Sequence, residues 1–391
     1  MGDFLGFSDL STSLIIHPSL PVLSAIWALA EEYKTSGKNI IVAHVIGVEV
    51  SCKISSAVMP QLHVAGWLPC AVLGVFGATA AAGKILGLDE EQMTNALGIA
   101  GMEASGIRVA MGTMSKSYGR GRAGENAVVA ATLAQMGFTG PTNVLEGKDG
   151  FLQTFSGGMS GDKIINSLGN PYTFVSPGIT LKPFPSCTCS HTSIDAALTL
   201  RNEHKFSSEE IESVECSVSP AVASMMKFSF PENPLEAKYS LEFCVASALV
   251  DGKVTISSFF PERLKEHKII DTMKKIGKRV SPELEKLGYA PESAPFGSEV
   301  RIRLKDGREY RCIKELGPWE PKGRPSRDEL ISKYRECANV LKPSEIDETV
   351  NIILNLETTK DICQIMDIVR VYPENGEKTS GYYERGYEPS K

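Results

Sequence analysis

The stretch VLGVFGATAAAGKILGL, residues 72–88, predicts a helix that is apolar on almost every side. Residues 40–55 (IIVAHVIGVEVSCKIS) and 124–138 (GENAVVAATLAQMGF) have the same character. A helix without a polar face has to be covered on all sides, so these segments belong inside a helical bundle. Alanine and glycine dominate them, and such small residues let helix backbones approach each other closely. We therefore expect a mainly α fold.

The composition changes after this helical region. Residues 170–187 (NPYTFVSPGITLKPFPSC) carry four prolines, which indicates a linker followed by extended chain. Residues 211–219 (IESVECSVS) then alternate apolar and polar side chains, as a strand does. Residues 299–313 (EVRIRLKDGREYRCI) alternate around an Asp-Gly turn, which predicts a β-hairpin. Residues 317–326 (GPWEPKGRPS) break the chain again before amphipathic helices return.

These changes predict an all-α helical domain built from both ends of the chain, with an α+β domain inserted into it. The expected boundaries are 1–178 for the N-terminal part of the all-α domain, 179–320 for the α+β domain, 321–372 for the C-terminal helices, and 373–391 for a polar, disordered tail.

The bulk composition limits the classes of partner. The chain has 391 residues, 42% of them hydrophobic, and a formal net charge of -6. This mild acidity argues against nucleic acid or an anionic membrane as the partner, and it leaves a small anionic substrate open. The nine cysteines are scattered, so we expect reduced thiols in a cytoplasmic protein. The longest apolar stretches, such as residues 70–82, fall short of a membrane span, and no transmembrane helix is expected.

Residues 114–127 (MSKSYGRGRAGENA) concentrate cations among glycines in this acidic chain. We expect a glycine-rich loop that leads into a helix starting near residue 124, because backbone N–H groups at a helix start and nearby cations together bind anions. The phosphate-binding G-x-x-x-x-G-K-[S/T] pattern is absent, which argues against a nucleotide. A solvated basic loop is the alternative. The residues of this candidate anion site are Lys116, Arg120, Gly121 and Arg122.

Residues 181–195 (LKPFPSCTCSHTSID) place a lysine, two cysteines and a histidine close together. A zinc site needs four ligands, and no partner C-x-x-C or H-x₃-H pattern occurs elsewhere, so we expect no metal. Lys182 is instead expected at the mouth of a cleft, with Cys187 and Cys189 as packed thiols. His191 either caps its helix, packs or binds a ligand. His17, directly before a proline at a helix entrance, is on the residues alone more typical of a structural histidine.

Five separated blocks, residues 17–50, 66–89, 113–141, 181–198 and 236–254, resemble the MmgE/PrpD family of 2-methylcitrate dehydratase, cis-aconitate decarboxylase and their relatives. The resemblance implies an all-α domain, an α+β lid domain, a homodimer, and an active site between the domains that uses no metal or other cofactor. It implies small di- or tricarboxylate substrates that are dehydrated, decarboxylated or isomerised.

The resemblance also assigns roles to individual residues. Lys116 and Lys182 match the family's active-site lysines, and His17 matches a histidine of the same pocket. The remaining residues expected to bind the substrate are Arg120, Arg122, Gly121, Asp9, Cys187 and His191. The chain departs from the family pattern at several positions: Gly6 for a catalytic aspartate, Leu68 for a histidine, Cys187 for the histidine of decarboxylases, and Phe243 for their tyrosine. The chain also begins late for the family, which fits a shortened or diverged member.

We therefore expect a lyase that dehydrates a 2-methylcitrate-like hydroxy-tricarboxylate by removing a proton next to a carboxylate. Lys116, crowded by neighbouring arginines, is the expected base, and Lys182 is expected to clamp a carboxylate. His17, Asp9 and His191 are the candidate proton donors to the leaving hydroxyl. The alternatives are a cis-aconitate decarboxylase, a diacid isomerase or epimerase, and a catalytically inactive carboxylate-binding paralogue.

Overall fold

The computed structural model describes residues 2–158, 161–287, 296–320 and 323–370. It divides into two compact units, each described here by itself. Among the described residues, the first unit holds residues 2–3, 8–180 and 338–370, and the second holds residues 4–7 and 181–337. The predicted tail, 373–391, lies outside the described residues.

The first unit is helical. Its longer helices are α2 (Ser19–Tyr33), α3 (Gly37–Val58), α6 (Gly74–Leu86), α7 (Glu90–Gly101), α8 (Met114–Gln135), α19 (Pro343–Leu354) and α20 (Cys363–Val369). Its short helices are α4 (Gln61–Val64), α5 (Pro69–Val72), η1 (Arg108–Ala110), α9 (Phe151–Ser156), α10 (Asp162–Ser167) and η4 (Leu356–Thr358), and α1 (Gly2–Leu5) begins in this unit.

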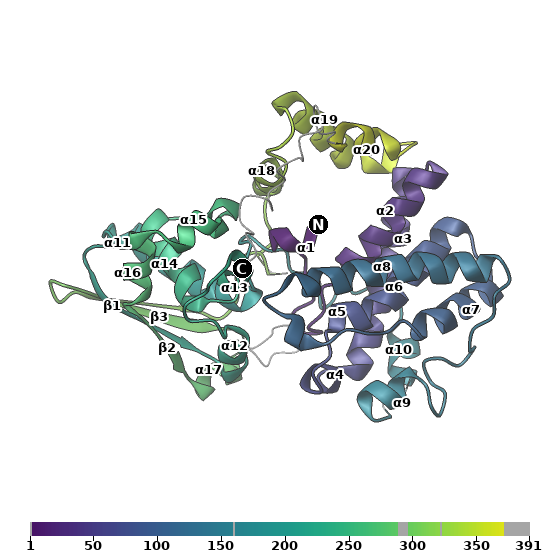
Figure 1. Cartoon of the computed structure of the whole chain (residues 1–391), viewed down its shortest axis with the longest axis horizontal. Helices are drawn as coiled ribbons and strands as arrows, with labels where there is room; N and C mark the ends of the chain where they lie inside the picture. The colour runs from purple at the N-terminus through teal and green to yellow at the C-terminus, as the bar shows by residue number, and fades with distance from the viewer. Residues whose placement is uncertain (1, 159–160, 288–295, 321–322, 371–391) are drawn as a thin grey trace, which may run out of the picture. The chain divides into compact units, whose positions relative to one another are not determined.

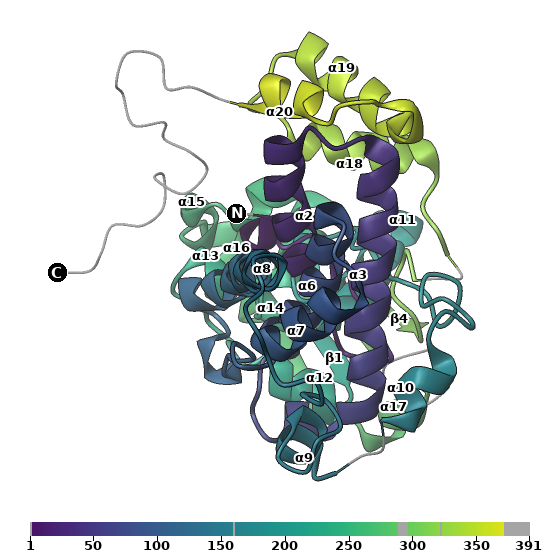
Figure 2. The ribbon, with the colours of Figure 1, turned by 90° about the vertical axis from the view of Figure 1, so that its right-hand side faces the viewer.

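Helix α6 is the centre of the first unit, because it contacts α2, α3, α7 and α8. Figure 2 looks nearly along α8 and shows these helices gathered around one another. The close approach predicted from small residues is present where α3 crosses α6. A Cβ atom added at Gly77 would lie 1.9 Å from the Ser51 hydroxyl oxygen and 2.2 Å from the Gly47 carbonyl oxygen. The mainly α fold predicted from the sequence is confirmed.

The C-terminal helices α19 and α20 lie against the ends of α2 and α3, as Figures 1 and 2 both show. Two backbone hydrogen bonds fix them there: the N–H of Gly37 donates to the carbonyl of Thr359 (2.9 Å), and the N–H of Ile362 donates to the carbonyl of Thr35 (3.0 Å). Segments from both ends of the described chain therefore share one core.

Two helical stretches of this unit, Gly37–Val58 and Pro69–Leu86, are long and apolar enough to cross a membrane. The expectation that the longest apolar stretches fall short of a membrane span was therefore wrong, because these two have the necessary length and composition. The burial of 61% and 83% of their respective 18-residue windows inside the protein accounts for the apolar character in another way. Both helices supply the core of the bundle, where no polar face is needed.

The second unit is an α+β arrangement around one four-stranded sheet with the order β2-β1-β3-β4. Its strands are β1 (Ile211–Val218), β2 (Ile276–Val280), β3 (Ser298–Leu304) and β4 (Glu309–Lys314). Its helices are η2 (Thr188–Ser190), α11 (His191–His204), α12 (Pro220–Met225), α13 (Pro234–Ala237), α14 (Leu241–Asp251), η3 (Ile256–Phe259), α15 (Pro261–Leu264), α16 (His267–Met273), α17 (Pro282–Leu287) and α18 (Arg327–Cys337).

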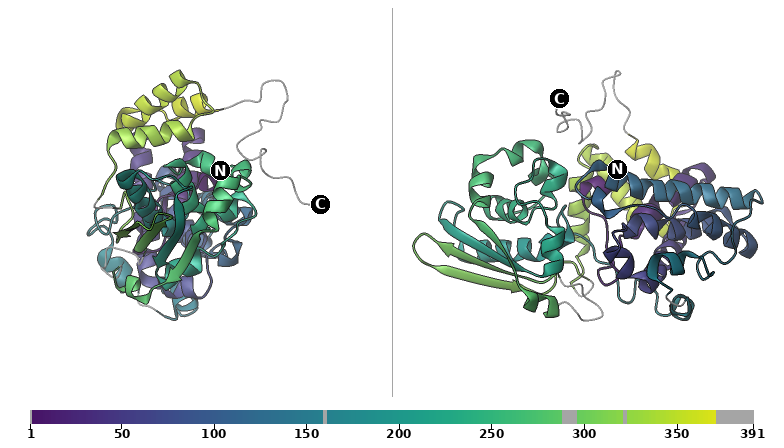
Figure 3. Two further views of the ribbon diagram at one scale, coloured as in Figure 1. Left: turned by 90° about the vertical axis from the view of Figure 1, so that its left-hand side faces the viewer. Right: turned by 60° about the horizontal axis from the view of Figure 1, so that its bottom comes forward.

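The predicted hairpin is present as the antiparallel pair β3–β4, and its turn is closed by Gly307 at a φ of 90°. Strand β1 pairs antiparallel with β3 and parallel with β2. Helices α11 and α14 cover one face of the sheet, which Figures 1 and 3 show beside the strands. Strand β2 was not predicted, because its sequence IGKRV lacks a sustained apolar alternation.

Helix α18 corrects the expected boundary at residue 321, since it groups with the second unit and not with the all-α domain. Its Lys333 ammonium donates to the carbonyl of Lys182 (2.8 Å), and its Glu336 carboxylate accepts from the N–H of Ile256 (2.7 Å). The sequence predicts that the chain returns to the all-α domain before this helix. In the structure the chain returns to the first unit after α18, at residue 338.

Candidate functional site

The glycine-rich segment predicted as a loop is the first part of helix α8, which begins at Met114 and not near residue 124. The expected anion site at a helix start is therefore wrong in its position. Packing explains the glycines better than a loop does. A Cβ atom at Gly124 would lie 2.9 Å from the Pro21 carbonyl oxygen, so this glycine allows α2 to approach α8. The helical conformation places Lys116 and Arg120, four residues apart, on the same face.

Three side chains on this face of α8 converge on the carboxylate of Asp3. The Lys116 ammonium donates to both carboxylate oxygens, at 3.3 and 3.1 Å, and the Ser117 hydroxyl donates to one of them at 2.7 Å. The Arg120 guanidinium donates to the other oxygen. Burial by itself raises the pKa of Asp3, but the charges of Arg120 and Lys116 outweigh it and hold this pKa well below its usual range. Together, these residues form the α8 carboxylate group: Asp3, Lys116, Ser117 and Arg120.

Asp3 and Ser117 were not predicted as site residues. Lys116 and Asp3 are 113 residues apart in the chain, so no local pattern predicts their contact. The pairing also changes the expected state of Lys116. Its ammonium is not surrounded by cations alone, because a carboxylate lies 3.1 Å away.

Arg122 and Gly121 lie elsewhere on α8. The Arg122 guanidinium forms an ion pair at 2.6 Å with Glu125 on the same helix, and 40% of its side chain is exposed. A Cβ atom added at Gly121 would meet nothing within 4 Å, so packing within the unit does not require a glycine there. Neither residue takes part in the contacts around Asp3, and their predicted roles in substrate binding stay predictions.

His17 and Asp9 belong to a second hydrogen-bonded group in the first unit. The Nδ1–H of His17 donates to the backbone carbonyl of Asp9 (2.5 Å), so the proton that the ring can exchange is the one on Nε2. The Asp9 carboxylate accepts from the Ser19 hydroxyl (2.5 Å) and from the Ser19 N–H (3.3 Å), and it thereby caps the start of α2. His44 Nε2 completes the group by donating to the Ser19 hydroxyl oxygen (2.9 Å), and burial lowers the pKa of His44 to about 4.

The second unit holds another cationic group, formed by Lys182, Lys333 and the neutral ring of His191. Lys182 is buried, and its ammonium donates to the Ser186 carbonyl at 3.1 Å. His191 is 1% exposed at the start of α11, and its ring lies edge-on to Phe184. Burial, with the nearby charges of Lys182 and Lys333 adding to it, holds the pKa of His191 well below its usual range. Lys333 was not predicted as a site residue, because α18 was assigned to the other domain.

The thiols and the replaced positions are mostly packed. Cys189 is buried, and Cys187 packs against the same apolar core. All nine cysteines, which lie within the described residues, are free thiols. Phe243 is fully buried in the core of the second unit, and Leu68 is buried in the first. Within the described parts of the chain, no three His, Cys, Asp or Glu side chains gather as a metal site would require.

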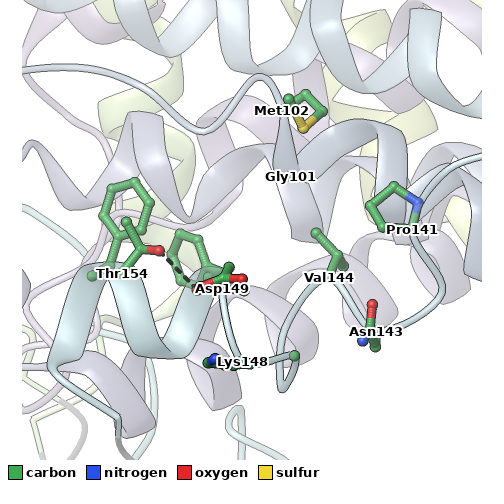
Figure 4. A pocket seen from close by; sticks show the side chains of 12 residues that line it. Gly101, Met102, Pro141, Asn143, Val144, Lys148, Asp149 and Thr154 are labelled. Atoms are coloured by element: carbon green, nitrogen blue, oxygen red, sulfur yellow. Dashed lines mark hydrogen bonds between the residues drawn. The ribbon is translucent and has the colours of Figure 1, made fainter.

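A cavity of about 520 Å³ lies in the first unit beside α9. Figure 4 shows Met102, Pro141, Val144 and Thr154 around it, with the Thr154 hydroxyl donating to the Gly150 carbonyl at 2.9 Å. None of the predicted site residues lines this cavity, and its chemistry does not resemble that of the cationic groups.

Two protein-family models match this chain. The model of the MmgE/PrpD N-terminal domain matches residues 1–162, and the model of the MmgE/PrpD C-terminal domain matches residues 184–358. The chain belongs to the MmgE/PrpD family. This confirms the resemblance read from the five sequence blocks. The α8 carboxylate group lies in the part matched by the N-terminal domain of the family, and Lys182 lies just before the part matched by its C-terminal domain.

Curated relatives in the MmgE/PrpD family are lyases. The chain is 28% identical over 389 residues to cis-aconitate decarboxylase of Aspergillus terreus, covering 92% of this chain and 77% of the relative. It is 27% identical to cis-aconitate decarboxylase of Homo sapiens, covering 93% and 76% respectively. It is 24% identical over 245 residues to 2-methylcitrate dehydratase of Salmonella typhimurium, covering 60% and 50%. These relatives support a lyase of this family and leave its substrate to a proposal.

Proposed function

We propose that this chain is a metal-independent lyase that dehydrates a 2-methylcitrate-like hydroxy-tricarboxylate. The observation that carries the proposal is the α8 carboxylate group, in which Lys116, Ser117 and Arg120 already bind one carboxylate, that of Asp3. Within this group Lys116 is more exposed than Arg120, and its fixed ammonium is the donor we assign to a carboxylate of a polycarboxylate substrate. Membership of a lyase family supports the same reading.

The proposed reaction removes a proton from a carbon next to a carboxylate and expels the neighbouring hydroxyl as water. Negative charge develops on that carboxylate as the C–H bond breaks. Ammonium groups aimed at this charge stabilise the transition state more than the substrate, and removing one such donor typically costs about 10²–10³ in rate. We propose that Lys116 and Lys182 provide this stabilisation.

Proton transfer is assigned to His17. Its Nδ1–H is held by the Asp9 carbonyl, so the proton that the ring can exchange is the one on Nε2. The Lys116 ammonium forms an ion pair with Asp3 at 3.1 Å, so we assign Lys116 to binding the substrate carboxylate and not to proton abstraction. The Asp9 carboxylate accepts two hydrogen bonds from Ser19, which favours a structural role for it over proton donation.

The test is turnover of 2-methylcitrate, followed by the ultraviolet absorbance of the new double bond. Lys116→Met and Lys182→Met are expected to lower kcat about a hundredfold or more. Lys84→Met and Lys253→Met, which remove exposed lysines of the first and second unit, serve as matched controls and are expected to keep full rate. The proposal fails if the unsubstituted protein turns over no hydroxy-tricarboxylate.

A second candidate is decarboxylation of cis-aconitate. The extent of the similarity favours it, because the decarboxylases match 90% or more of this chain and the Salmonella dehydratase matches 60%. The burial of Phe243 at the position of a decarboxylase tyrosine speaks for the dehydratase. Release of carbon dioxide from cis-aconitate, without formation of a double bond from 2-methylcitrate, would select the decarboxylase.

We also propose that the protein acts as a homodimer in the cytoplasm. The side chains of Met114, Tyr118 and Val129 lie on one face of α8, Met136 follows directly after the helix, and each of the four is at least half exposed. The Arg122–Glu125 ion pair lies on this face between Tyr118 and Val129, so the face offers two exposed apolar ends and a charged centre to a second copy. Sedimentation of the protein and of Val129→Glu tests this, since the substitution is expected to yield monomers. The nine free thiols support a reducing compartment, which cell fractionation tests.

A further inference from the structure

The two cations of the α8 carboxylate group differ in exposure. The Arg120 side chain is 4% exposed, and so is the carboxylate-bearing side chain of Asp3 that it contacts. The Lys116 side chain is 16% exposed. A ligand that approaches this face of α8 therefore has more access to the Lys116 side chain than to that of Arg120.

The charges of the group also indicate different roles for Lys116 and Arg120. Lys116 and Arg120 contribute two positive charges to the group and Asp3 contributes one negative charge. Arg120 directs its guanidinium at the buried Asp3 carboxylate. Its influence on a ligand therefore passes through Asp3.

We propose that Asp3 is a positioning residue for the reaction: its carboxylate fixes the Lys116 ammonium where the substrate carboxylate binds, and Arg120 fixes Asp3. This inference rests on the proposed function. A lysine side chain has many rotamers, and an ammonium held by a carboxylate loses less freedom when it binds substrate. Misplacement of a catalytic group by about 1 Å can cost about a hundredfold in rate.

An opposite role for Asp3, as an internal mimic that competes with substrate, fits the structure less well. If Asp3 left the group, the Arg120 guanidinium would stay buried without its carboxylate, and a buried charge that loses its partner is strongly unfavourable. The Ser117 hydroxyl would lose its acceptor as well. Asp3 is thus held as a permanent part of the group.

The first test is a double-mutant cycle on the turnover of 2-methylcitrate. Asp3→Asn keeps the shape of the side chain and removes its charge, and it is expected to lower kcat about tenfold to a hundredfold. In the Lys116→Met background the same change is expected to have no further effect, because Asp3 acts through Lys116. Equal losses in both backgrounds, or tighter binding of the substrate by Asp3→Asn, would overturn the inference.

The second test does not depend on activity. Acetic anhydride labels lysines according to how free their amines are, and peptide mass spectrometry reports each site. In Asp3→Asn, labelling of Lys116 is expected to rise several-fold relative to the exposed Lys84, while the buried Lys53 stays protected and shows that the unit remains folded. An unchanged ratio of Lys116 to Lys84 refutes the inference. If no substrate is turned over, the proposed function fails, and the labelling still decides the role of Asp3.

Discussion

Substitution of Gly77 by alanine tests whether the helices of the first unit pack as closely as the structure shows. The added Cβ would lie 1.9 Å from the Ser51 hydroxyl oxygen and 2.2 Å from the Gly47 carbonyl oxygen. Carbon atoms in good contact with their neighbours lie about 3.5–4.0 Å away. The serine hydroxyl can rotate, but the carbonyl belongs to the backbone of α3. Helices α3 and α6 would therefore have to separate by more than about 1 Å at this point.

The magnitude follows from two opposing effects. Alanine in place of glycine inside a helix gains about 1 kcal/mol from propensity. Overpacking of a close-packed core costs about 1–3 kcal/mol, and more where the clash is with backbone. Because α6 also contacts α2 and α8, a shift of this helix disturbs several interfaces, and we expect a net loss of about 2 kcal/mol. For a unit of this size the loss corresponds to a fall in Tm of about 4–8 °C.

Gly121→Ala is the matched control, because the same change on α8 meets no atom within 4 Å. The propensity gain is then unopposed, and the free energy of unfolding is expected to rise by up to about 1 kcal/mol. Urea titrations followed by tryptophan fluorescence, to which Trp27 and Trp67 of the first unit and Trp319 of the second contribute, compare the two variants. Equal midpoints for Gly77→Ala and Gly121→Ala would refute the close approach of α3 and α6. A fall in activity of the stabilised Gly121→Ala would support the predicted ligand contact of Gly121.

Three further predictions concern titratable side chains of the first unit. The Glu49 carboxylate accepts hydrogen bonds from two backbone N–H groups at 2.8 and 2.7 Å and lies 3.5 Å from the Lys53 ammonium. Glu49→Ala is therefore expected to lower the free energy of unfolding, measured by urea denaturation, by about 3–5 kcal/mol. The exposed control Glu90→Ala is expected to lower it by about 0.5 kcal/mol or less. Because the pKa of His44 falls from 6.5 to about 4 in the folded state, stability is expected to be lost as the pH falls from about 6.5 to 4, by about 3 kcal/mol at most. Urea midpoints measured across this range check it, and His44→Gln is expected to remove the slope. The pKa of Asp3 is held well below its usual range, so Asp3→Asn is expected to destabilise the protein at pH 7. The stabilisation from Asp3 is lost as the pH falls below about 4, so the difference in Tm between Asp3→Asn and the unsubstituted chain should narrow there.

The parts of the fold that were predictable are those with a strong local pattern. The apolar stretch 72–88 predicted a buried helix, and α5 and α6 form the centre of the bundle there. The alternation around the Asp306-Gly307 turn predicted the β3–β4 hairpin, because turn and strand signals agree. Strand β2 has no such pattern. It forms because the edge of β1 offers unpaired backbone groups, and this is a property of the sheet rather than of residues 276–280.

The start of α8 shows the limit of propensity arguments. Three glycines within six residues favour a loop, yet the segment is helical from Met114. At Gly124 the missing side chain makes room for α2, so tertiary packing outweighs a local penalty of about 1 kcal/mol per glycine. Once the segment is a helix, the separation of Lys116 and Arg120 becomes one turn, and the geometry of the candidate site follows from it.

General electrostatics explains why the α8 carboxylate group contains an anion, although it does not say which residue supplies that anion. A helix face that buries an arginine beside a lysine needs an anion, because an unpaired buried charge is far more costly than a paired one. Sequence reasoning could therefore have required a carboxylate near Arg120 and still not have identified it as Asp3, 117 residues away. The consequence for function is specific. A face with two cations and no anion would bind small anions with little discrimination. Here the Asp3 carboxylate fixes the Lys116 ammonium, so the face selects a ligand by the position of its carboxylate more than by its charge.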